Sequence, residues 1–302
     1  MIEKIEEEGE HFKGLMRVEV TQPRIDLINE VVYAQYFGNG TRSLRMTIFM
    51  PNTKDPKPCV VYFPGGGFTT SDYGKWSRVR MALALQGFVV AAVEYRPLPF
   101  AFPSMLIDGK AAIRYLRAHA EQFGIDTNRI GVMGNSAGGY LAQLVTMTAN
   151  EREFDVGDFL EYSSEVQACC DIFGPYNFET ISEGYSKEVQ TWHNSPAASE
   201  ALLVGGVTYG TEPAASIPNN AMKALWASPK GHLHANLPPF LIMHGTADKM
   251  VSKYQSEHLY KALKQLNVPA EFYLLEGAGH GDDPWFQQPV IDLIVGWFKK
   301  HL

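Results

Sequence analysis

Short apolar runs alternate with amphipathic segments through most of this chain. Residues 59–63, 88–93 and 130–133 are continuous apolar runs, which are typical of strands buried on both faces of a sheet. Residues 76–86 and 105–123 repeat apolar positions at helical spacing, and each segment is followed by a glycine. This alternation predicts an α/β fold with a mostly parallel central sheet and helices on both faces.

Both ends of the chain extend this pattern. Residues 30–36 and 44–49 alternate apolar and polar positions, and Gly38, Asn39 and Gly40 between them favour the turn of an antiparallel hairpin. The remaining expected elements are strands at residues 166–173, 239–243 and 270–275 and helices at residues 140–148, 256–266 and 285–302.

The periodicity is lost between residues 174 and 236, where Gly, Pro, Ser and Asn become frequent. A stretch this long without a clear pattern is usually a lid or a binding region. We therefore expect one domain over residues 1–302 with a short irregular lid-like insertion at residues 174–236. Residues 1–25 are expected to form an N-terminal arm, and their run of glutamates predicts a solvated helix or a frayed segment.

The charge and the cysteines narrow the classes of partner and compartment. A net charge of −7 argues against nucleic acid and anionic membranes as main partners, because both favour a basic surface. The chain shows neither an apolar run long enough for a transmembrane helix nor a signal peptide, which predicts a cytoplasmic location unless a leader has been removed. Cys59, Cys169 and Cys170 lie in apolar stretches, so we expect buried free thiols. Whether the chain forms a homo-oligomer stays open.

One serine lies in a sequence context that favours catalysis. Residues 134–138 read Gly-Asn-Ser-Ala-Gly, directly after the strand at residues 130–133 and before the helix at residues 140–148. A serine on such a sharp strand-to-helix turn is exposed, and small neighbours allow the backbone to close. Ser136 is therefore the predicted nucleophile.

A serine hydroxyl needs a base, and two later segments supply the required groups. His280 lies between glycines after the last predicted strand, which suits a loop that carries an imidazole over the sheet edge. Asp248 follows the strand at residues 239–243, and its carboxylate can orient the histidine. Asp282 and Asp283 follow His280 too closely to be the favoured orienting group, although one of them could support the loop.

Consecutive glycines after the strand at residues 59–63 predict an oxyanion hole. Residues 64–68 read Pro-Gly-Gly-Gly-Phe, and glycine allows backbone N–H groups to approach an oxygen closely. The N–H of Ala137 could complete the hole. A phosphate-binding loop is the alternative, but the chain has neither of the usual glycine-rich phosphate motifs at this place.

These motifs together resemble the α/β-hydrolase esterases, especially the small bacterial esterase and lipase group with a His-Gly-Gly-Gly oxyanion loop. This group overlaps the hormone-sensitive-lipase-like carboxylesterases and the acetylxylan or feruloyl esterases. The resemblance covers residues 31–302 and includes residues 94–97, 126–130, 195–196, 203–206, 238–245 and 255–256. It implies an α/β-hydrolase fold and a triad of Ser136, Asp248 and His280.

The same resemblance implies Gly66, Gly67 and Ala137 as the oxyanion donors. Pro64 departs from the family pattern, since it stands where the family usually has histidine. A side-chain hydrogen bond that braces the loop is therefore expected to be missing. The insertion is short for a full helical cap, which implies a fairly open acyl pocket.

The expected function is serine-dependent hydrolysis of a carboxylic ester through an acyl-serine intermediate, with a small-molecule substrate and no cofactor or metal. The resemblance extends this to short acyl, acetyl or hydroxycinnamoyl esters. An amidase, formamidase or peptidase with the same triad is the first alternative. A binding protein that has lost catalysis is the second, although the intact triad argues against it.

Overall fold

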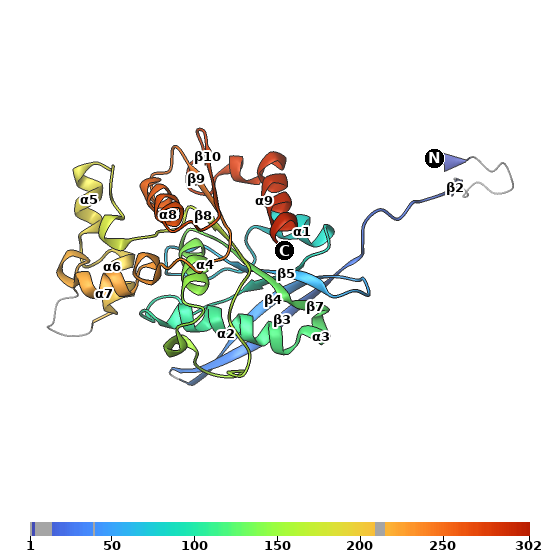
Figure 1. Ribbon diagram of the computed structural model, residues 1–302, viewed down its shortest axis with the longest axis horizontal. Coiled ribbons are helices and arrows are strands. Elements are labelled where there is room, and N and C mark those ends of the chain that lie inside the picture. Colours follow the sequence, from blue (N-terminus) through green and yellow to red (C-terminus); the bar gives the residue numbers. More distant parts are fainter. Residues whose placement is uncertain (1, 4–13, 39, 209–214) are drawn as a thin grey trace.

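The computed structural model describes residues 2–3, 14–38, 40–208 and 215–302. It contains an eight-stranded sheet in the order β10-β9-β8-β7-β5-β6-β4-β3, shown in Figure 1. The strands from β10 to β6 in this order run parallel, whereas β4 and β3 join the edge as antiparallel strands. The bounds are β3 (Ile25–Gly38), β4 (Gly40–Pro51), β5 (Lys57–Phe63), β6 (Val89–Val93), β7 (Ile125–Asn135), β8 (Ala168–Ile172), β9 (Phe240–Gly245) and β10 (Ala270–Leu275).

Burial on both faces explains why the central strands are apolar throughout. In β5, Cys59, Val61 and Phe63 belong to the core on one side of the sheet, and Val60 and Tyr62 belong to the core on the other side. All five side chains are fully buried. A strand that alternates between two cores has no solvent face, so it shows no apolar and polar alternation.

Helices cover both faces, as the sequence predicted. Apolar residues of α1 (Ser77–Leu85) and α9 (Gln288–His301) pack into one core. Apolar residues of α2 (Ser104–Ala118), α3 (Ala120–Phe123), α4 (Ala137–Met147) and α8 (Tyr254–Gln265) pack into the other. The predicted α/β architecture is confirmed.

All the expected helices have somewhat different bounds in the structure. The helix expected at residues 105–123 is divided into α2 and α3 at His119, whose backbone N–H and ring Nδ1 both bond the carbonyl oxygen of Tyr115, at 3.0 and 2.9 Å. The last helix begins at Gln288 instead of residue 285. Pro289 suits the first turn of α9, and Asp283–Phe286 forms a separate short 3₁₀ helix.

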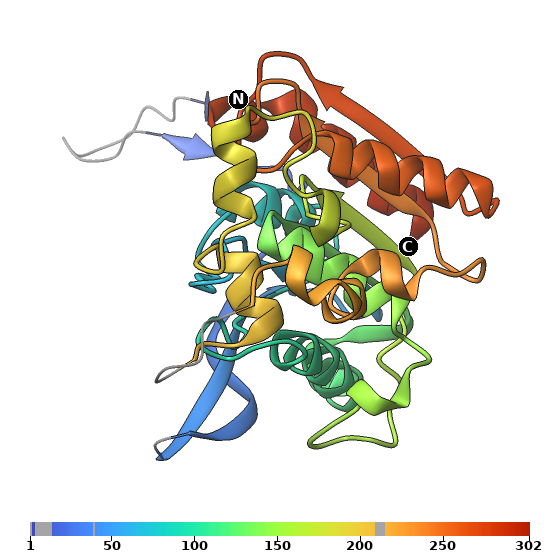
Figure 2. The same ribbon diagram turned by 90° about the vertical axis from the view of Figure 1, so that its left-hand side faces the viewer.

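The insertion at residues 174–236 is less irregular than the sequence suggested. Its described residues include three short α-helices, α5 (Lys187–His193), α6 (Ser199–Gly205) and α7 (Ala221–Trp226), and Figure 2 shows this part of the chain facing the viewer. Helices of about two turns are too short to give a visible apolar repeat. Gln255 on α8 anchors the start of the insertion, because its side chain accepts from the N–H groups of Tyr176 and Asn177 and donates to the carbonyl of Thr180.

The described part of the N-terminal arm extends away from the sheet, on the side opposite the insertion (Figure 1). It carries a short antiparallel pair of β1 (Ile2–Glu3) and β2 (Leu15–Met16). Most of the glutamate run lies outside the described residues, as does Asn39 at the predicted hairpin turn. The β3 and β4 strands that this turn joins are paired as expected.

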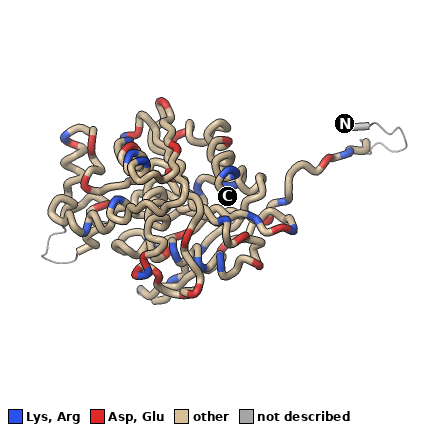
Figure 3. Tube along the Cα trace, in the orientation of Figure 1, with Lys and Arg blue, Asp and Glu red and all other residues tan. Residues whose placement is uncertain are grey.

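The structure shows where the charged residues and the cysteines lie. Lys and Arg are interspersed with Asp and Glu along the trace in Figure 3. The three cysteines are free and buried, as expected. Among the helices of the described residues, none is both long and apolar enough to cross a membrane.

Candidate active site

Ser136 occupies the tight turn between β7 and α4. Its φ and ψ are 54° and −124°, an unfavourable conformation for a residue with a side chain. A Cβ atom at Gly134 would lie 2.1 Å from the carbonyl oxygen of Gly138, and one at Gly138 would lie 2.0 Å from the carbonyl oxygen of Phe63. Both flanking positions must therefore be glycine for the turn to close. This close packing is the physical reason for the Gly-x-Ser-x-Gly spacing.

Three distant segments meet at this turn. His280 Nε2 lies 2.8 Å from Ser136 Oγ, and His280 Nδ1 lies 2.7 Å from Asp248 Oδ2. With a proton on Nδ1, the imidazole donates to Asp248 and accepts the serine hydroxyl. The Asp248 side chain is fully buried and that of His280 is 13% exposed, so the hydrogen-bonded line opens to solvent at its serine end.

The surroundings of Asp248 keep its carboxylate ionised. Burial raises its pKa, but hydrogen bonds from His244 and His280 lower it more strongly, so the net pKa lies below its ordinary value. The other carboxylate oxygen, Oδ1, accepts from the N–H groups of Met250 and Val251 at 2.8 and 3.0 Å. Asp248 thus presents a fixed negative charge to the imidazole.

The loop that carries His280 is held by residues on its C-terminal side. The indole N–H of Trp285 donates to the carbonyl oxygen of Gly279 at 2.9 Å, and the N–H of Gly279 donates to Asp282 Oδ2 at 2.8 Å. Asp282 therefore braces the loop and does not bond the imidazole. Asp283 begins the short 3₁₀ helix. Of the three aspartates considered from sequence, Asp248 is the one that the structure brings to His280.

The glycine loop faces the serine across the same pocket. Gly66 and Gly67 line this pocket together with Ser136. Ala137 is the first residue of α4, where a backbone N–H has no partner within the helix. Among the described residues, no hydrogen bond engages the N–H of Gly66, Gly67 or Ala137. All three donors are therefore free to receive an oxygen.

The glycine loop is braced even though Pro64 replaces the family's histidine. The hydroxyl of Tyr95 donates to the carbonyl oxygen of Pro64 at 2.6 Å. Asn135 Oδ1 accepts both the hydroxyl of Tyr62 at 2.8 Å and the N–H of Gly65 at 3.1 Å. All these contacts are buried. The hydrogen bonds of Tyr95 to Pro64 and of Gly65 to Asn135 thus take the place of the missing brace. Neither hydrogen bond was expected from the sequence.

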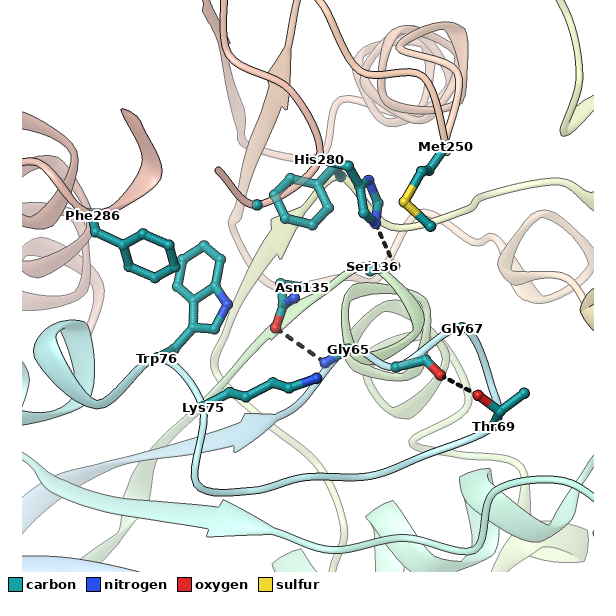
Figure 4. Close-up of a pocket in the computed structure, with 13 residues that line it drawn as sticks. Gly65, Gly67, Thr69, Lys75, Trp76, Asn135, Ser136, Met250, His280 and Phe286 are labelled. Atoms are coloured by element: carbon teal, nitrogen blue, oxygen red, sulfur yellow. Dashed lines mark hydrogen bonds between the residues drawn. The ribbon is translucent and has the colours of Figure 1, made fainter. Parts of the chain in front are cut away.

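The candidate site opens into a pocket of about 560 Å³. In Figure 4, Trp76 and Phe286 lie together at one end of the pocket, and Met250 lies beside His280. Trp76 has a φ of 57°, and its ring centroid lies 5.1 Å from that of Phe286. Lys75 adds a cation to the lining. Within the described residues, no group of three or more His, Cys, Asp or Glu side chains could hold a metal ion.

The residues that form this pocket wall could not be recognised in the sequence. Trp76 precedes α1, Met250 lies in the loop after β9 and Phe286 ends a short 3₁₀ helix, and no spacing along the chain links them to Ser136. The φ of 57° at Trp76 depends on how the chain enters α1, which a single sequence does not show. Only the glycines and the three reacting groups stand in a local motif.

This chain is similar to known esterases in sequence and in structure. The probable carboxylic ester hydrolase LipM of Mycobacterium tuberculosis is 30% identical over 72% of this chain and 47% of its own length, so the chain spans about half of that relative. A truncated carbohydrate esterase from gut microbiota superposes with a TM-score of 0.78 at 24% identity, over 93% of this chain and 98% of the other. Esterase 2 of Thermogutta terrifontis, phosphonylated by cyclosarin, superposes with a TM-score of 0.67 at 25% identity, over 93% and 95%.

The structural likeness and the sheet order together identify the α/β-hydrolase fold that the motifs implied. The model of the BD-FAE family matches residues 46–263, a span that includes the glycine loop, Ser136 and Asp248. His280 lies beyond the matched residues but completes the same hydrogen-bonded line. The chain belongs to the BD-FAE family.

Proposed function

We propose that this protein hydrolyses carboxylic esters, with Ser136 as nucleophile, His280 as general base and acid, and Asp248 as the group that orients His280. The observation that carries the proposal is the continuous line of hydrogen bonds from Ser136 Oγ through His280 to Asp248, at 2.8 and 2.7 Å. Similarity to LipM, a probable carboxylic ester hydrolase, supports the reaction class. Phosphonylation of the similar Thermogutta terrifontis esterase by cyclosarin supports the presence of a reactive nucleophile in this fold.

In the proposed acylation, Ser136 Oγ attacks the carbonyl carbon while its proton passes to His280 Nε2. The carbonyl π electrons move to oxygen, and the N–H groups of Gly66, Gly67 and Ala137 receive the resulting oxyanion. Collapse of the tetrahedral intermediate breaks the bond to the alcohol oxygen. That oxygen takes the proton from His280 and leaves as the alcohol, so the acyl group remains on Ser136.

Deacylation repeats these steps with water as the nucleophile. Water gives a proton to His280 Nε2 and attacks the acyl carbon, which forms a second oxyanion. Collapse returns the proton to Ser136 Oγ and releases the carboxylic acid. Asp248 stabilises the imidazolium in both halves of the cycle, since its charge lies 2.7 Å from Nδ1.

The proposed substrates are short acyl, acetyl or hydroxycinnamoyl esters. A pocket of about 560 Å³ has room for a small acyl group or one aromatic ring beside Ser136. Trp76, Phe173 and Phe286 provide an aromatic wall on which a planar group could stack. Rates for acetyl, butyryl, octanoyl and feruloyl esters test this proposal, because the octanoyl ester should be the poorest of the four.

The decisive assay compares an ester and an amide that share an acyl group and an aromatic leaving group. We expect 4-nitrophenyl acetate to be turned over with a far higher kcat/KM than 4-nitroacetanilide. The Ser136→Ala variant should lose ester turnover by at least about 10⁴-fold, because both the nucleophile and its proton are removed.

The exposed Ser163 offers a matched serine-to-alanine control, which should keep wild-type rates. Circular dichroism should show all three proteins folded. Turnover that survives in Ser136→Ala would overturn the assignment of the nucleophile. A higher kcat/KM for the anilide would instead indicate an amidase.

A further inference from the structure

Asp171 is a buried carboxyl group without a charged partner. It lies near the end of β8, and its side chain is fully inaccessible to solvent. Its Oδ1 accepts the N–H of Gly174 at 3.0 Å, but its Oδ2 has no hydrogen-bond partner among the described residues. An ionised carboxylate in this position would carry its charge with a single neutral hydrogen bond, which is energetically unfavourable.

This carboxyl group lies directly behind the turn that carries Ser136. A Cβ atom at Gly139 would lie 2.5 Å from Asp171 Oδ1, and one at Gly174 would lie 2.4 Å from it. Gly139 is in the first turn of α4, three residues after Ser136. Asp171 therefore contacts the backbone that sets the position of the serine and of the Ala137 N–H.

Gln143, one turn further along α4, has its side-chain amide close to Asp171. Its amide lowers the pKa of the carboxyl group by hydrogen bonding, but less than burial raises it. The amide Nε2 also donates to the carbonyl oxygen of Pro175 at 3.3 Å, while the amide oxygen Oε1 is buried without a donor. Two acceptors in this cluster, Asp171 Oδ2 and Gln143 Oε1, are buried, and no described group donates a hydrogen bond to either of them. One proton on Asp171 would supply the donor and remove the charge.

Within the described part of the chain, no Lys or Arg side chain forms a hydrogen bond or an ion pair with Asp171. The titratable groups near Asp171 on the same and adjacent elements are Cys169 and Cys170 on β8, Tyr140 on α4, Tyr176 after β8 and His244 on β9. Asp126 and Arg129 lie toward the other end of β7, whose Gly134 pairs with Asp171. Burial raises the pKa of each of these cysteines and tyrosines, which keeps them neutral. His244 Nδ1 bonds the hydroxyl of Ser256. Its Nε2 lies 2.9 Å from the carbonyl oxygen of Val251 and 3.4 Å from Asp248 Oδ2, so this ring contacts the carboxylate of Asp248.

We propose that Asp171 is a positioning residue that works as a neutral carboxylic acid, holding the first turn of α4 in place without adding charge beneath the oxyanion site. The inference rests on the proposed ester hydrolysis for its effect on rate. The negative charge of ionised Asp171 would cancel part of the positive charge at the start of α4. It would also repel the oxyanion that forms beside Ala137. Rising pH should therefore lower the rate through this group.

The pKa indicates where this change occurs. Burial raises the pKa of Asp171 from 3.8 to about 7. In the unfolded chain the group ionises near 3.8, so between these values the folded protein binds more protons than the unfolded chain. The contribution of Asp171 to stability therefore falls as pH rises from about 4 to about 7, and the full penalty persists above that range.

The Asp171→Asn variant tests the proposal, because asparagine is an uncharged isostere that supplies an acceptor to Gly174 and donors toward Gln143. We would measure kcat for 4-nitrophenyl acetate from about pH 5.5 to about pH 9.5. The variant should match the wild type within about twofold at low pH. It should lack an alkaline decrease of about tenfold that the wild type shows. Asp292→Asn, an exposed carboxylate on α9, should keep the wild-type profile.

Thermal unfolding gives a second readout that does not depend on turnover. Asp171→Asn should be more stable than the wild type at pH 8, by at least about 5 °C in Tm, and the difference should shrink toward pH 4. The proposal would be overturned if the variant were unfolded or less stable than the wild type at pH 8, or if its Tm differed from that of the wild type by the same amount at every pH. An alkaline decrease in kcat that persists in the variant would also overturn it. If the wild type turns over no ester, the proposed function fails, whereas the unfolding data still test the protonation of Asp171.

Discussion

At the scale of single residues, Asp248 combines a structural and an electrostatic role. Its Oδ1 accepts two backbone N–H groups, and its Oδ2 faces the imidazole of His280. Asparagine can keep the first role through its carbonyl oxygen. It removes the charge that stabilises the imidazolium, and its amide N–H₂ would favour the wrong tautomer of His280.

We therefore predict that Asp248→Asn folds normally and loses about 10⁴-fold in kcat for 4-nitrophenyl acetate, with a much smaller change in KM. Steady-state kinetics and circular dichroism measure the two parts of this prediction. Asp282→Asn is a useful comparison, because Asp282 bonds the backbone of the same loop without contacting the imidazole. A loss as large in Asp282→Asn would indicate that loop position, rather than charge, determines the rate.

The three residues of the candidate triad could be chosen from the sequence because each belongs to a short motif with a local physical cause. Gly134 and Gly138 are required by contacts of 2.1 and 2.0 Å, and such a requirement is visible in the sequence. Asp171 could not be predicted in the same way. Its importance comes from its burial and from the hydrogen-bond partner that its Oδ2 lacks in the folded structure. The place of Asp171 in a strand does not reveal either property.

At the scale of elements, the glycine loop depends on Asn135 for its position. This residue occupies the variable place beside Ser136, and its Oδ1 accepts from Gly65 and Tyr62. From the sequence, Asn135 was assigned no role, and Pro64 was expected to leave the loop without a side-chain brace. The structure links the oxyanion loop to the nucleophile turn through this one amide oxygen.

We predict that Asn135→Ala lowers kcat about 10- to 100-fold with little change in KM, because the donors of the loop lose their alignment with the developing oxyanion. Tyr62→Phe is the matched control. It removes one donor to Asn135 and leaves the bond to Gly65, so it should cost much less. An unchanged kcat in Asn135→Ala, or an effect confined to KM, would show that the loop is held by other contacts.

Helices longer than two turns could be predicted from periodicity, whereas α5, α6 and α7 could not. Each of these three helices is seven residues long or shorter, so an apolar residue recurs once at most on its inner face. Their positions depend on tertiary contacts such as the bonds of Gln255 to Tyr176 and Asn177. The helical content of residues 174–236 was therefore not visible in the sequence.

At the scale of the whole molecule, the parallel sheet is what assembles the candidate site. β7 and β9 end near Ser136 and Asp248, and β10 precedes the loop of His280. Because these strands are parallel, their carboxyl ends lie at one edge, and residues 144 positions apart in the chain reach hydrogen-bonding distance. The order of motifs along the sequence was enough to predict this arrangement, since the strand order of the fold fixes where each loop lies.

The central claim is that Ser136 is an activated nucleophile, and covalent labelling tests it most directly. Folded protein would be treated with a fluorophosphonate probe and examined by intact mass and peptide mapping. We predict one adduct per chain, located on Ser136, which is lost in Ser136→Ala and slowed strongly in Asp248→Asn. Failure of the folded wild type to react, or an adduct on another residue that persists in Ser136→Ala, would contradict the account.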